Sequence, residues 1–286
     1  LFIDIKMNPQ ELTVVITTFH SQDKIFKCLN SIDKKIDIIM IENTDDSSFK
    51  KKVESQYKNV KCILAGENLG YAKGNNLGLS KVKSKYALIL NPDSVVEKNT
   101  IENFFLSAKK IPSFAIIAPK IQDEKKYFEE DDNQELIEVD KVKGFAMFLN
   151  LDQFEKIGFF DDNFFIYLEE TDLCRRLREN NKKIYLDPNI KINHLGGSSH
   201  NEDIEYEMEL SRNWHWMWST FYYNKKHGNF TKALFKVSGK LLSAFLKTIL
   251  YSITFNKTKK RIYFQRLLGL INSIAGKKSW YRPKIF

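Results

Sequence analysis

Cysteine is scarce in this chain, and long apolar runs are missing from it. The three cysteines, Cys28, Cys62 and Cys174, form no CxxC pair. An odd, scattered set is typical of reduced thiols in a cytosolic protein and argues against a disulfide framework or a zinc site. No stretch reaches the 18 apolar residues of a membrane-spanning helix, and Leu1–Glu11 lacks a signal-peptide core. We therefore expect a protein that neither crosses a membrane nor is exported by that route.

Acidic residues are absent from Gly228 to Phe286, a stretch that contains 13 Lys and Arg. The other 32 basic residues and all 36 acidic ones lie in positions 1–227, so the formal net charge of +9 comes from the tail. With 43% hydrophobic residues the chain can bury one substantial core. This asymmetry predicts a main domain over 1–227 and a basic, surface-binding segment over 228–286.

Strand and helix patterns alternate along the main domain. Short apolar runs predict strands at Leu12–Thr18, Ile36–Glu42, Val60–Ala65, Tyr86–Leu90, Ala115–Pro119, Ala146–Leu149 and Lys183–Leu186. Helical spacing predicts helices at Ser21–Ile32, Phe49–Tyr57 and Tyr71–Ser80. The charged stretch Asp123–Glu138 is expected to be a surface excursion. The alternation indicates an α/β fold with a mostly parallel central sheet, in which ligands bind at the strand ends.

Asn91-Pro92-Asp93 directly follows the strand predicted at Tyr86–Leu90. A carboxylate there emerges at the edge of the sheet, where it can hold a divalent cation. Mg²⁺ and Mn²⁺ favour carboxylate and phosphate oxygens and often use only one or two protein carboxylates. The same residues also favour a simple turn, so both interpretations stay open.

Three carboxylates lie within four positions in Glu169-Glu170-Thr171-Asp172, after the aromatic run Phe159–Tyr167. Close carboxylates raise one another's pKa toward the working pH, which suits a base that deprotonates a hydroxyl. Acidic residues equally favour the first turn of a helix because of its macrodipole. The cluster therefore indicates either a general base or a helix start.

His194 is followed by Gly196 and Gly197, which allow close approach of the backbone to a ligand. A lone histidine beside an apolar residue is more often structural than a ligand. The glycines make a metal or phosphate contact a reasonable hypothesis.

Together these motifs carry a family resemblance. The ordered set is LTVVITTF (12–19), IEN (41–43), ENLGYAKGNNLG (67–78), LNPDS (90–94), GFFDDNFFIYLEETD (158–172) and HLGGS (194–198). It resembles family 2 glycosyltransferases of the rhamnosyltransferase-like branch over about positions 12 to 227, which makes 1–227 the catalytic domain. The resemblance implies the GT-A fold for that part of the chain.

The resemblance also implies site residues. For the nucleotide-sugar donor it indicates Thr17, Thr18, Phe19, Glu42, Asn43, Gly70, Asn76 and Asn91. For Mg²⁺ or Mn²⁺ it indicates Asp93, the retained acid of an Asp-x-Asp motif in which Asn91 replaces the other acid, together with His194. Glu170 matches the general base, Glu169 precedes it, and Asp172 supports the following helix.

The implied reaction is an inverting, metal-dependent transfer of a sugar, without a covalent intermediate, in cell-surface polysaccharide or glycolipid synthesis. The donor would be dTDP-rhamnose or a UDP-sugar, and the acceptor a hydroxyl of a glycan or a lipid-linked molecule. We expect a cytoplasmic enzyme, peripheral at the inner face of the plasma membrane, and no nucleic-acid partner.

Two other classes of protein share parts of this pattern. A nucleotide-dependent oxidoreductase would share the alternating sheet, but no GxGxxG follows the first strand, and Gly70–Gly78 has the wrong spacing. A non-catalytic protein that binds nucleic acid or an anionic surface would explain the basic tail. That interpretation does not explain the presence of Asp93 and of the Glu169–Asp172 cluster.

The basic segment contains an amphipathic helical pattern. On a helical wheel Lys232, Lys236, Lys240 and Lys247 fall within an arc of about 80°, opposite Leu234, Val237, Leu241, Leu242, Phe245, Leu246 and Ile249. The apolar face either packs on the catalytic domain or a second subunit, or lies in the headgroup region of an anionic membrane. In the second case Tyr251, Phe255, Tyr263, Phe264, Trp280 and Tyr281 would be interfacial aromatics.

Overall fold

The computed structural model describes residues 8–120, 135–194 and 200–285. The chain divides into two compact units. The first, here called the sheet unit, comprises Leu1–Leu69, Gly74–Phe160 and Leu173–Asn201. The second, the helical unit, comprises Gly70–Lys73, Asp161–Asp172 and Glu202–Phe286. The boundary expected at Gly228 falls between two helices of the helical unit, and a separate domain over 228–286 stays a prediction.

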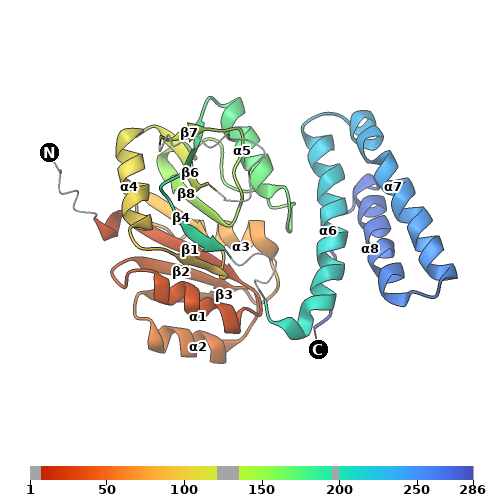
Figure 1. Cartoon of the computed structure of the whole chain (residues 1–286), viewed down its shortest axis with the longest axis horizontal. Coiled ribbons are helices and arrows are strands. Elements are labelled where there is room, and N and C mark those ends of the chain that lie inside the picture. Colours follow the sequence, from red (N-terminus) through yellow and green to blue (C-terminus); the bar gives the residue numbers. More distant parts are fainter. Residues whose placement is uncertain (1–7, 121–134, 195–199, 286) are drawn as a thin grey trace. The chain divides into compact units, whose positions relative to one another are not determined.

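An eight-stranded sheet forms the centre of the sheet unit (Figure 1). Its strands are β1 (Leu12–Thr18), β2 (Asp37–Glu42), β3 (Val60–Leu64), β4 (Tyr86–Leu90), β6 (Phe114–Pro119), β7 (Ile137–Glu138), β8 (Ala146–Asn150) and β9 (Lys183–Asp187). Their order in space is β3-β2-β1-β4-β8-β6-β9-β7. The strands β3, β2, β1 and β4 pair in parallel, as do β6 and β9, whereas β8 runs antiparallel between β4 and β6. The expected mostly parallel sheet is confirmed.

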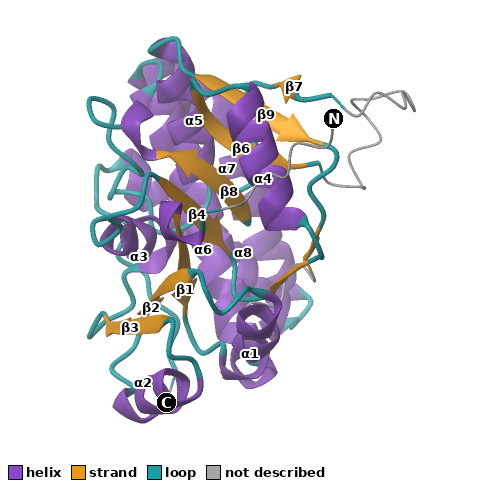
Figure 2. Ribbon diagram, turned by 90° about the vertical axis from the view of Figure 1, so that its left-hand side faces the viewer, coloured by secondary structure: helices purple, strands orange, loops and turns teal. Residues whose placement is uncertain are grey.

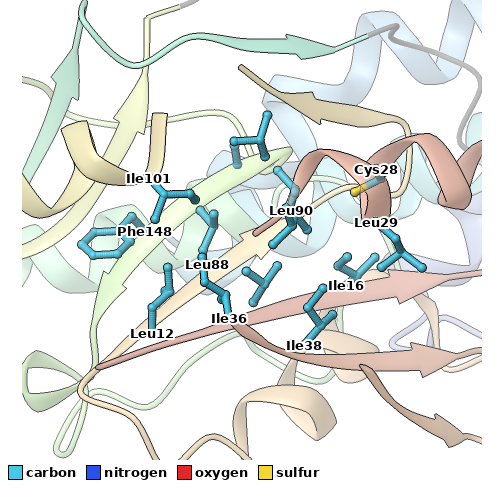
Figure 3. Packing of buried hydrophobic residues seen from close by; sticks show 14 of the residues in the cluster. Leu12, Ile16, Cys28, Leu29, Ile36, Ile38, Leu88, Leu90, Ile101 and Phe148 are labelled. Atoms are coloured by element: carbon cyan, nitrogen blue, oxygen red, sulfur yellow. The ribbon is translucent and has the colours of Figure 1, made fainter. Parts of the chain in front are cut away.

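Helices cover both faces of this sheet (Figure 2). They are α1 (Gln22–Ser31), α2 (Ser47–Gln56), α3 (Gly70–Leu79), α4 (Thr100–Lys110) and α5 (Glu169–Glu179). Figure 3 shows the core on one face, where Leu12 and Ile16 of β1 pack with Cys28 of α1 and Ile101 of α4. Alternate residues of a strand point to opposite faces, so Val15 and Thr17 face the other side of β1.

Two glycines of α3 bring that helix unusually close to β1. A Cβ added to Gly74 would lie 2.6 Å from Thr17 Cγ2, and one added to Gly78 would lie 2.5 Å from Val15 Cγ1. Larger side chains at either position would push the helix off the strand. The glycine spacing of the sequence motif is therefore a packing requirement of α3.

A second, two-stranded sheet joins β5 (Ser94–Val96) to β10 (Ile192–His194) in antiparallel register. The register places His194 opposite Ser94. Segments separated by about a hundred positions in the sequence are thereby tied together at the end of the Asn91–Asp93 motif.

The helical unit contains three long helices that lie side by side (Figure 1), namely α6 (Glu205–Lys226), α7 (Phe230–Ile253) and α8 (Lys257–Ile274). Asn229 accepts a hydrogen bond from Lys232 N and Asn256 one from Lys259 N, so each asparagine caps the helix that follows it. None of the helices in the described ranges has a length and apolarity sufficient to cross a bilayer.

Several local expectations need correction. The helix α4 was not predicted. The helix α5 begins at Glu169, so the acidic cluster is a helix start, which was one of its two expected interpretations. Tyr281 is buried against Trp214, with ring centroids 5.9 Å apart, and is not an interfacial aromatic. Of the excursion expected at Asp123–Glu138, most lies outside the described residues, and Ile137–Glu138 forms β7.

Candidate active site

The ends of β1 and β2 meet at the carboxyl edge of the sheet. Thr18 pairs with Glu42 in the parallel register, and its Oγ1 donates to Glu42 Oε2 at 2.5 Å. Thr44 Oγ1 donates to the other carboxylate oxygen at 2.8 Å. Glu42 is fully buried, and burial raises its pKa although both hydroxyls act in the opposite direction. In the structure the Glu42 carboxylate holds the side chains of Thr18 and Thr44 in place. A contact of Glu42 with the base or ribose of a nucleotide stays a prediction.

Thr17, Phe19 and Asn43 lie beside this pair. Asn43 N donates to Thr18 O at 2.9 Å, which joins the two strand ends beyond the sheet. A Cβ on Gly74 would come within 3.5 Å of Asn43 Nδ2, so α3 closes one side of the strand ends. The structure therefore brings together the predicted donor residues of β1 and β2.

The Asn91-Pro92-Asp93 motif forms a tight turn after β4. Ser94 N donates to Asn91 O at 3.1 Å, and Asn91 N donates to Phe145 O at 2.8 Å. The motif is therefore a turn that carries a buried carboxylate, and its role as a metal ligand stays a prediction. Asp93 lies near Cys28, whose thiol pKa is raised by burial and further by the charge of Asp93.

β10 brings a second predicted metal ligand toward this turn. His194 ends β10 opposite Ser94, the residue that follows Asp93. The glycines after it, Gly196 and Gly197, lie outside the described residues. The register places the backbone of His194 beside the turn, and a shared role of Asp93 and His194 in metal binding stays a prediction.

The donor atoms at this turn fit a hard divalent cation. Asp93 supplies a carboxylate that is almost completely buried at the carboxyl end of a central strand. Among the side chains that the structure describes, no three of His, Cys, Asp or Glu gather closely enough to hold a metal by themselves. Mg²⁺ and Mn²⁺ are commonly bound by one or two protein groups and the phosphates of a substrate. The arrangement suits a metal shared with a diphosphate.

The acidic cluster forms the first turn of α5, in the helical unit. Glu169 is buried, and burial raises its pKa well above the usual value, with a further increase from Glu170. Glu170 is half-buried and accepts a hydrogen bond from Thr171 Oγ1 at 3.0 Å. Burial and then the charges of these two glutamates also raise the pKa of Tyr71. The two carboxyl groups therefore differ. Burial favours the neutral form of Glu169, whereas Glu170 is partly exposed to solvent.

Asp172 is held by residues at the end of α6. Lys226 Nζ lies 2.7 Å from Asp172 Oδ1 and 2.7 Å from Asp161 Oδ2, and His227 Nε2 lies 2.7 Å from Asp172 Oδ1. Tyr222 donates to Asp161 at 2.9 Å. This network anchors the start of α5, in agreement with the supporting role expected of Asp172.

The sequence patterns missed Lys226 as the shared partner of Asp161 and Asp172. Lys226 and Asp161 are separated by 65 positions, and no local spacing links them.

The backbone before the cluster is strained and firmly held. Tyr167 and Leu168 have φ angles of +73° and +68°, a conformation that costs about 1–3 kcal/mol for each bulky residue. Ser219 Oγ donates to Ile166 O at 3.0 Å, and the His215 ring stacks on Phe165 with centroids 4.3 Å apart. These contacts from α6 fix the direction in which the glutamates leave the loop.

Arg282 and Gly70 complete this support. The Arg282 guanidinium lies 3.9 Å from the centroid of the Phe165 ring, and Tyr71 N donates to Phe165 O at 2.7 Å. A Cβ on Gly70 would come within 2.4 Å of Phe165 O, so only glycine fits there. Gly70 thus supports the glutamate loop, and the nucleotide contact expected of it stays a prediction.

Asn76 has a structural task in the sheet unit. Its Nδ2 donates to Phe160 O at 2.9 Å, and Phe160 N donates to its Oδ1 at 3.1 Å. The amide thereby fixes the residue that precedes the Asp161 segment. A direct contact with the nucleotide stays a prediction.

Comparison with known proteins decides the family. The model of glycosyl transferase family 2 matches residues 13–185, which include the strand ends, the Asp93 turn and α5. The chain belongs to glycosyltransferase family 2. The expected family membership is confirmed.

Two curated relatives of this family 2 glycosyltransferase are informative. Low-salt glycan biosynthesis hexosyltransferase Agl10 of Haloferax volcanii is 25% identical over 61% of this chain, and the match spans 64% of the length of Agl10. Rhamnosyltransferase WbbL of Escherichia coli is 23% identical over 73% of this chain and 91% of its own length. The similarity to WbbL agrees with the resemblance to the rhamnosyltransferase-like branch.

A solved structure supports the fold. The mannosyltransferase PcManGT of Pyrobaculum calidifontis, solved in complex with GDP-Man and Mn²⁺, superposes with a TM-score of 0.59 at 12% identity. The match covers 96% of this chain and 91% of PcManGT. The GT-A fold predicted from the sequence is therefore confirmed.

Proposed function

We propose that this chain transfers a sugar from a nucleotide-sugar donor to a hydroxyl of a glycan or lipid-linked acceptor, with inversion and with help from a divalent cation. The observation that carries the proposal is the family match over residues 13–185, a range that includes both Asp93 and Glu170. Agl10 is named for glycan biosynthesis and WbbL as a rhamnosyltransferase, which favours a hexose or rhamnose donor in cell-surface glycan synthesis.

Glu170 is the general base in this proposal. Glu169 is buried, and burial raises its pKa well above the usual value, whereas Glu170 beside it is half-buried. A half-buried carboxylate can take the proton of an acceptor hydroxyl as the oxygen attacks the anomeric carbon. Attack on the face opposite the leaving group gives inversion in a single displacement.

Asp93 and His194 would hold Mg²⁺ or Mn²⁺, and the structure of PcManGT contains Mn²⁺. Such an ion neutralises charge that develops on a departing nucleoside diphosphate. Thr18 and Asn43 line the strand ends where the nucleotide would bind, and Glu42 keeps Thr18 in place through its hydrogen bond. Asp172 acts by positioning α5, through Lys226 and His227.

The decisive experiment compares two neighbouring isosteric changes, Glu170→Gln and Glu169→Gln. Removing the base should lower transfer by about 10²–10⁴-fold, whereas an amide in place of a neutral carboxyl at Glu169 should keep most of it. Transfer is measured as nucleoside diphosphate released from dTDP-rhamnose and from UDP-sugars. Melting temperatures with UDP, GDP or dTDP show whether donor binding survives in both variants.

The opposite ranking of the two variants would move the base to Glu169. The metal assignment is checked in the same assay, because nucleotide-induced stabilisation should need Mn²⁺ or Mg²⁺ and should weaken in Asp93→Ala. Equal stabilisation by nucleotide in EDTA and in Mn²⁺ would contradict the assignment of Asp93 and His194. With the family established, the oxidoreductase hypothesis has no support.

A further inference from the structure

Helix α7 packs with its small side chains inward and presents its bulky apolar ones outward. Ala233, Val237 and Ala244 are buried against Met217 of α6 and Leu270 of α8. The outward residues are Phe235, Leu242, Phe245, Leu246, Ile249, Leu250 and Ile253. A helix that faces water normally has the reverse arrangement, with its largest apolar groups in the core.

The turn after α7 continues this surface. Phe255 is 88% exposed and has a φ of +54°, and Ile253 beside it is 68% exposed. The first turns of α8 then carry four cations, Lys257, Lys259, Lys260 and Arg261. The tip of the α7–α8 hairpin thus combines the most exposed apolar side chain of the described residues with a cluster of positive charge.

Lysines also follow the length of α7. At 100° per residue, Lys232, Lys236, Lys240 and Lys247 fall between the packed face and the outward apolar face. The Lys240 ammonium lies 5.6 Å from the centre of the Trp216 ring, and that of Lys247 lies 4.9 Å from the centre of the Tyr263 ring. The cations therefore lie along one edge of the outward apolar face.

We propose that the outward residues of α7 and Phe255, here called the hairpin surface, dock on an anionic lipid bilayer. Such a helix lies in the interface with its apolar face among the acyl chains and its cations at the headgroups. The segment from Gly228 to Phe286 has 13 basic residues and no acid, which complements a negatively charged membrane. The docking itself is argued independently of the proposed function. Only its benefit, which is access to a lipid-linked acceptor, rests on that function.

Charge argues against the other occupants of this surface. In a second copy of the chain the same face would bring lysines against lysines, which is unfavourable without acidic partners. Nucleic acid would use the cations but would leave a row of leucine, isoleucine and phenylalanine side chains without apolar contacts. An anionic bilayer satisfies both halves of the surface at once.

The test measures flotation of the chain with two kinds of vesicle. One contains phosphatidylcholine alone, and the other also contains about 30% of the anionic lipid phosphatidylglycerol. The chain should bind the anionic vesicles at low salt and lose affinity as salt rises, because exposed charges are screened. Replacing Leu242, Leu246 and Ile253 together by Ser should lower the affinity by about 1,000-fold, since each buried side chain contributes about tenfold.

Replacing Lys257, Lys259 and Lys260 by Gln should lower binding by about 100-fold, at roughly fivefold for each charge. Two matched controls lie in the sheet unit, where Leu106→Ser and the triple change of Lys34, Lys35 and Lys51 to Gln should leave flotation unchanged. Melting temperatures confirm that each variant folds. Release of nucleoside diphosphate from donor in the absence of vesicles separates failure of docking from failure of the proposed function.

Four results would overturn the proposal, the last of them being binding of RNA. The first is an absence of flotation with anionic vesicles at low salt, and the second is equal loss of binding in the sheet-unit controls. The third is a dimer that dissociates on the Leu242, Leu246 and Ile253 change, seen by sedimentation in the absence of lipid, because it would assign the surface to a second copy. Binding of single-stranded RNA that tolerates the serine changes and replaces vesicle binding would assign the cations to nucleic acid.

Discussion

The sheet unit and helix α7 treat bulky apolar side chains in opposite ways. Phe104, Phe114 and Phe148 are fully buried in the sheet unit, and their rings stack with centroid distances of 4.9 Å and 5.6 Å to Phe148. On α7, Phe235 is 82% exposed while an alanine occupies the packed face. The same chain thus buries its large apolar side chains in the sheet unit and exposes them on α7. Hydrophobic content alone does not tell which elements form a core.

Two buried carboxylates, one in each unit, are also compensated differently. In the sheet unit Glu42 is held by two neutral hydroxyls, and its pKa rises. In the helical unit Asp172 is held by Lys226 and His227. The first arrangement is suited to shaping a pocket, whereas the second fixes an element in place. Three changes test these differences.

The largest effect is expected from Phe148→Ala. The ring stacks with Tyr86, Phe104 and Phe114, so its loss leaves a cavity and should lower the free energy of unfolding by about 3–5 kcal/mol. The same change at Phe235 should cost less than about 0.5 kcal/mol in the absence of lipid. Urea unfolding of both variants measures the difference. Similar losses at the two positions would remove the contrast between core and hairpin surface.

A pH-dependent effect is expected from His215, in the core of the helical unit. Burial lowers its pKa to about 3, assisted by the charge of Arg282 and opposed by a hydrogen bond from Nε2 to Tyr281 O. The unfolded chain gains a proton near pH 6.5 and the folded chain does not, so stability falls as pH drops from about 6.5 to about 3. By pH 5 the loss from this group should be about 2 kcal/mol.

His215→Gln checks this contribution, because an amide can replace the hydrogen bonds that the ring makes with Tyr281 O and with Ser279 Oγ but does not titrate. Urea unfolding at pH 7 and pH 5 should show a smaller change in the variant than in the original chain. Parallel changes in the two proteins would mean that His215 is not held neutral. The result would also show whether the helical unit has a water-excluding core of its own, apart from the outward face of α7.

The smallest effect is expected from Lys226→Met. Burial acts to raise the pKa of Asp161, but the hydrogen bonds from Lys226 and Asn163 outweigh it and hold the pKa below its usual value. The stability from this pair is therefore present at neutral pH and is lost as pH falls below about 4. The variant should be about 1–2 kcal/mol less stable at pH 7, with a deficit that shrinks in acid. Lys225→Met is the matched control, and an equal deficit there would exclude a specific network.

The sequence predicted the sheet better than its topology. β1 and β4 match their expected bounds, since a run such as YALIL carries a clear local signal. The antiparallel insertion of β8 between β4 and β6 depends on contacts between distant residues, for which no short pattern exists. The helix α4 was missed, and its Asn99 precedes it in a left-handed conformation without a side-chain cap. A start of that kind gives no recognisable signal.

The site shows the same limit. The motif order led to the strand ends and to the glutamates, whereas the contacts of Asn76 with Phe160 and of Gly70 with Phe165 had no signal in the sequence. The helical wheel found the amphipathic pattern of α7 and treated Val237 and Leu242 as one face. Only the contacts with α6 and α8 separate the packed residue from the outward one. Both kinds of information come from tertiary structure.

The strained loop before Glu169 has a consequence for engineering the enzyme toward heat resistance. Glycine at position 167 or 168 would relax the backbone, and random mutagenesis selected on melting temperature alone would favour such changes. The resulting variants would be more stable, but the orientation of Glu169 and Glu170 would be less well defined. The loop that Ser219 and His215 contact would then adopt several conformations. Selection for thermal stability therefore favours glycine at positions 167 and 168, whereas selection for catalytic rate favours the original residues.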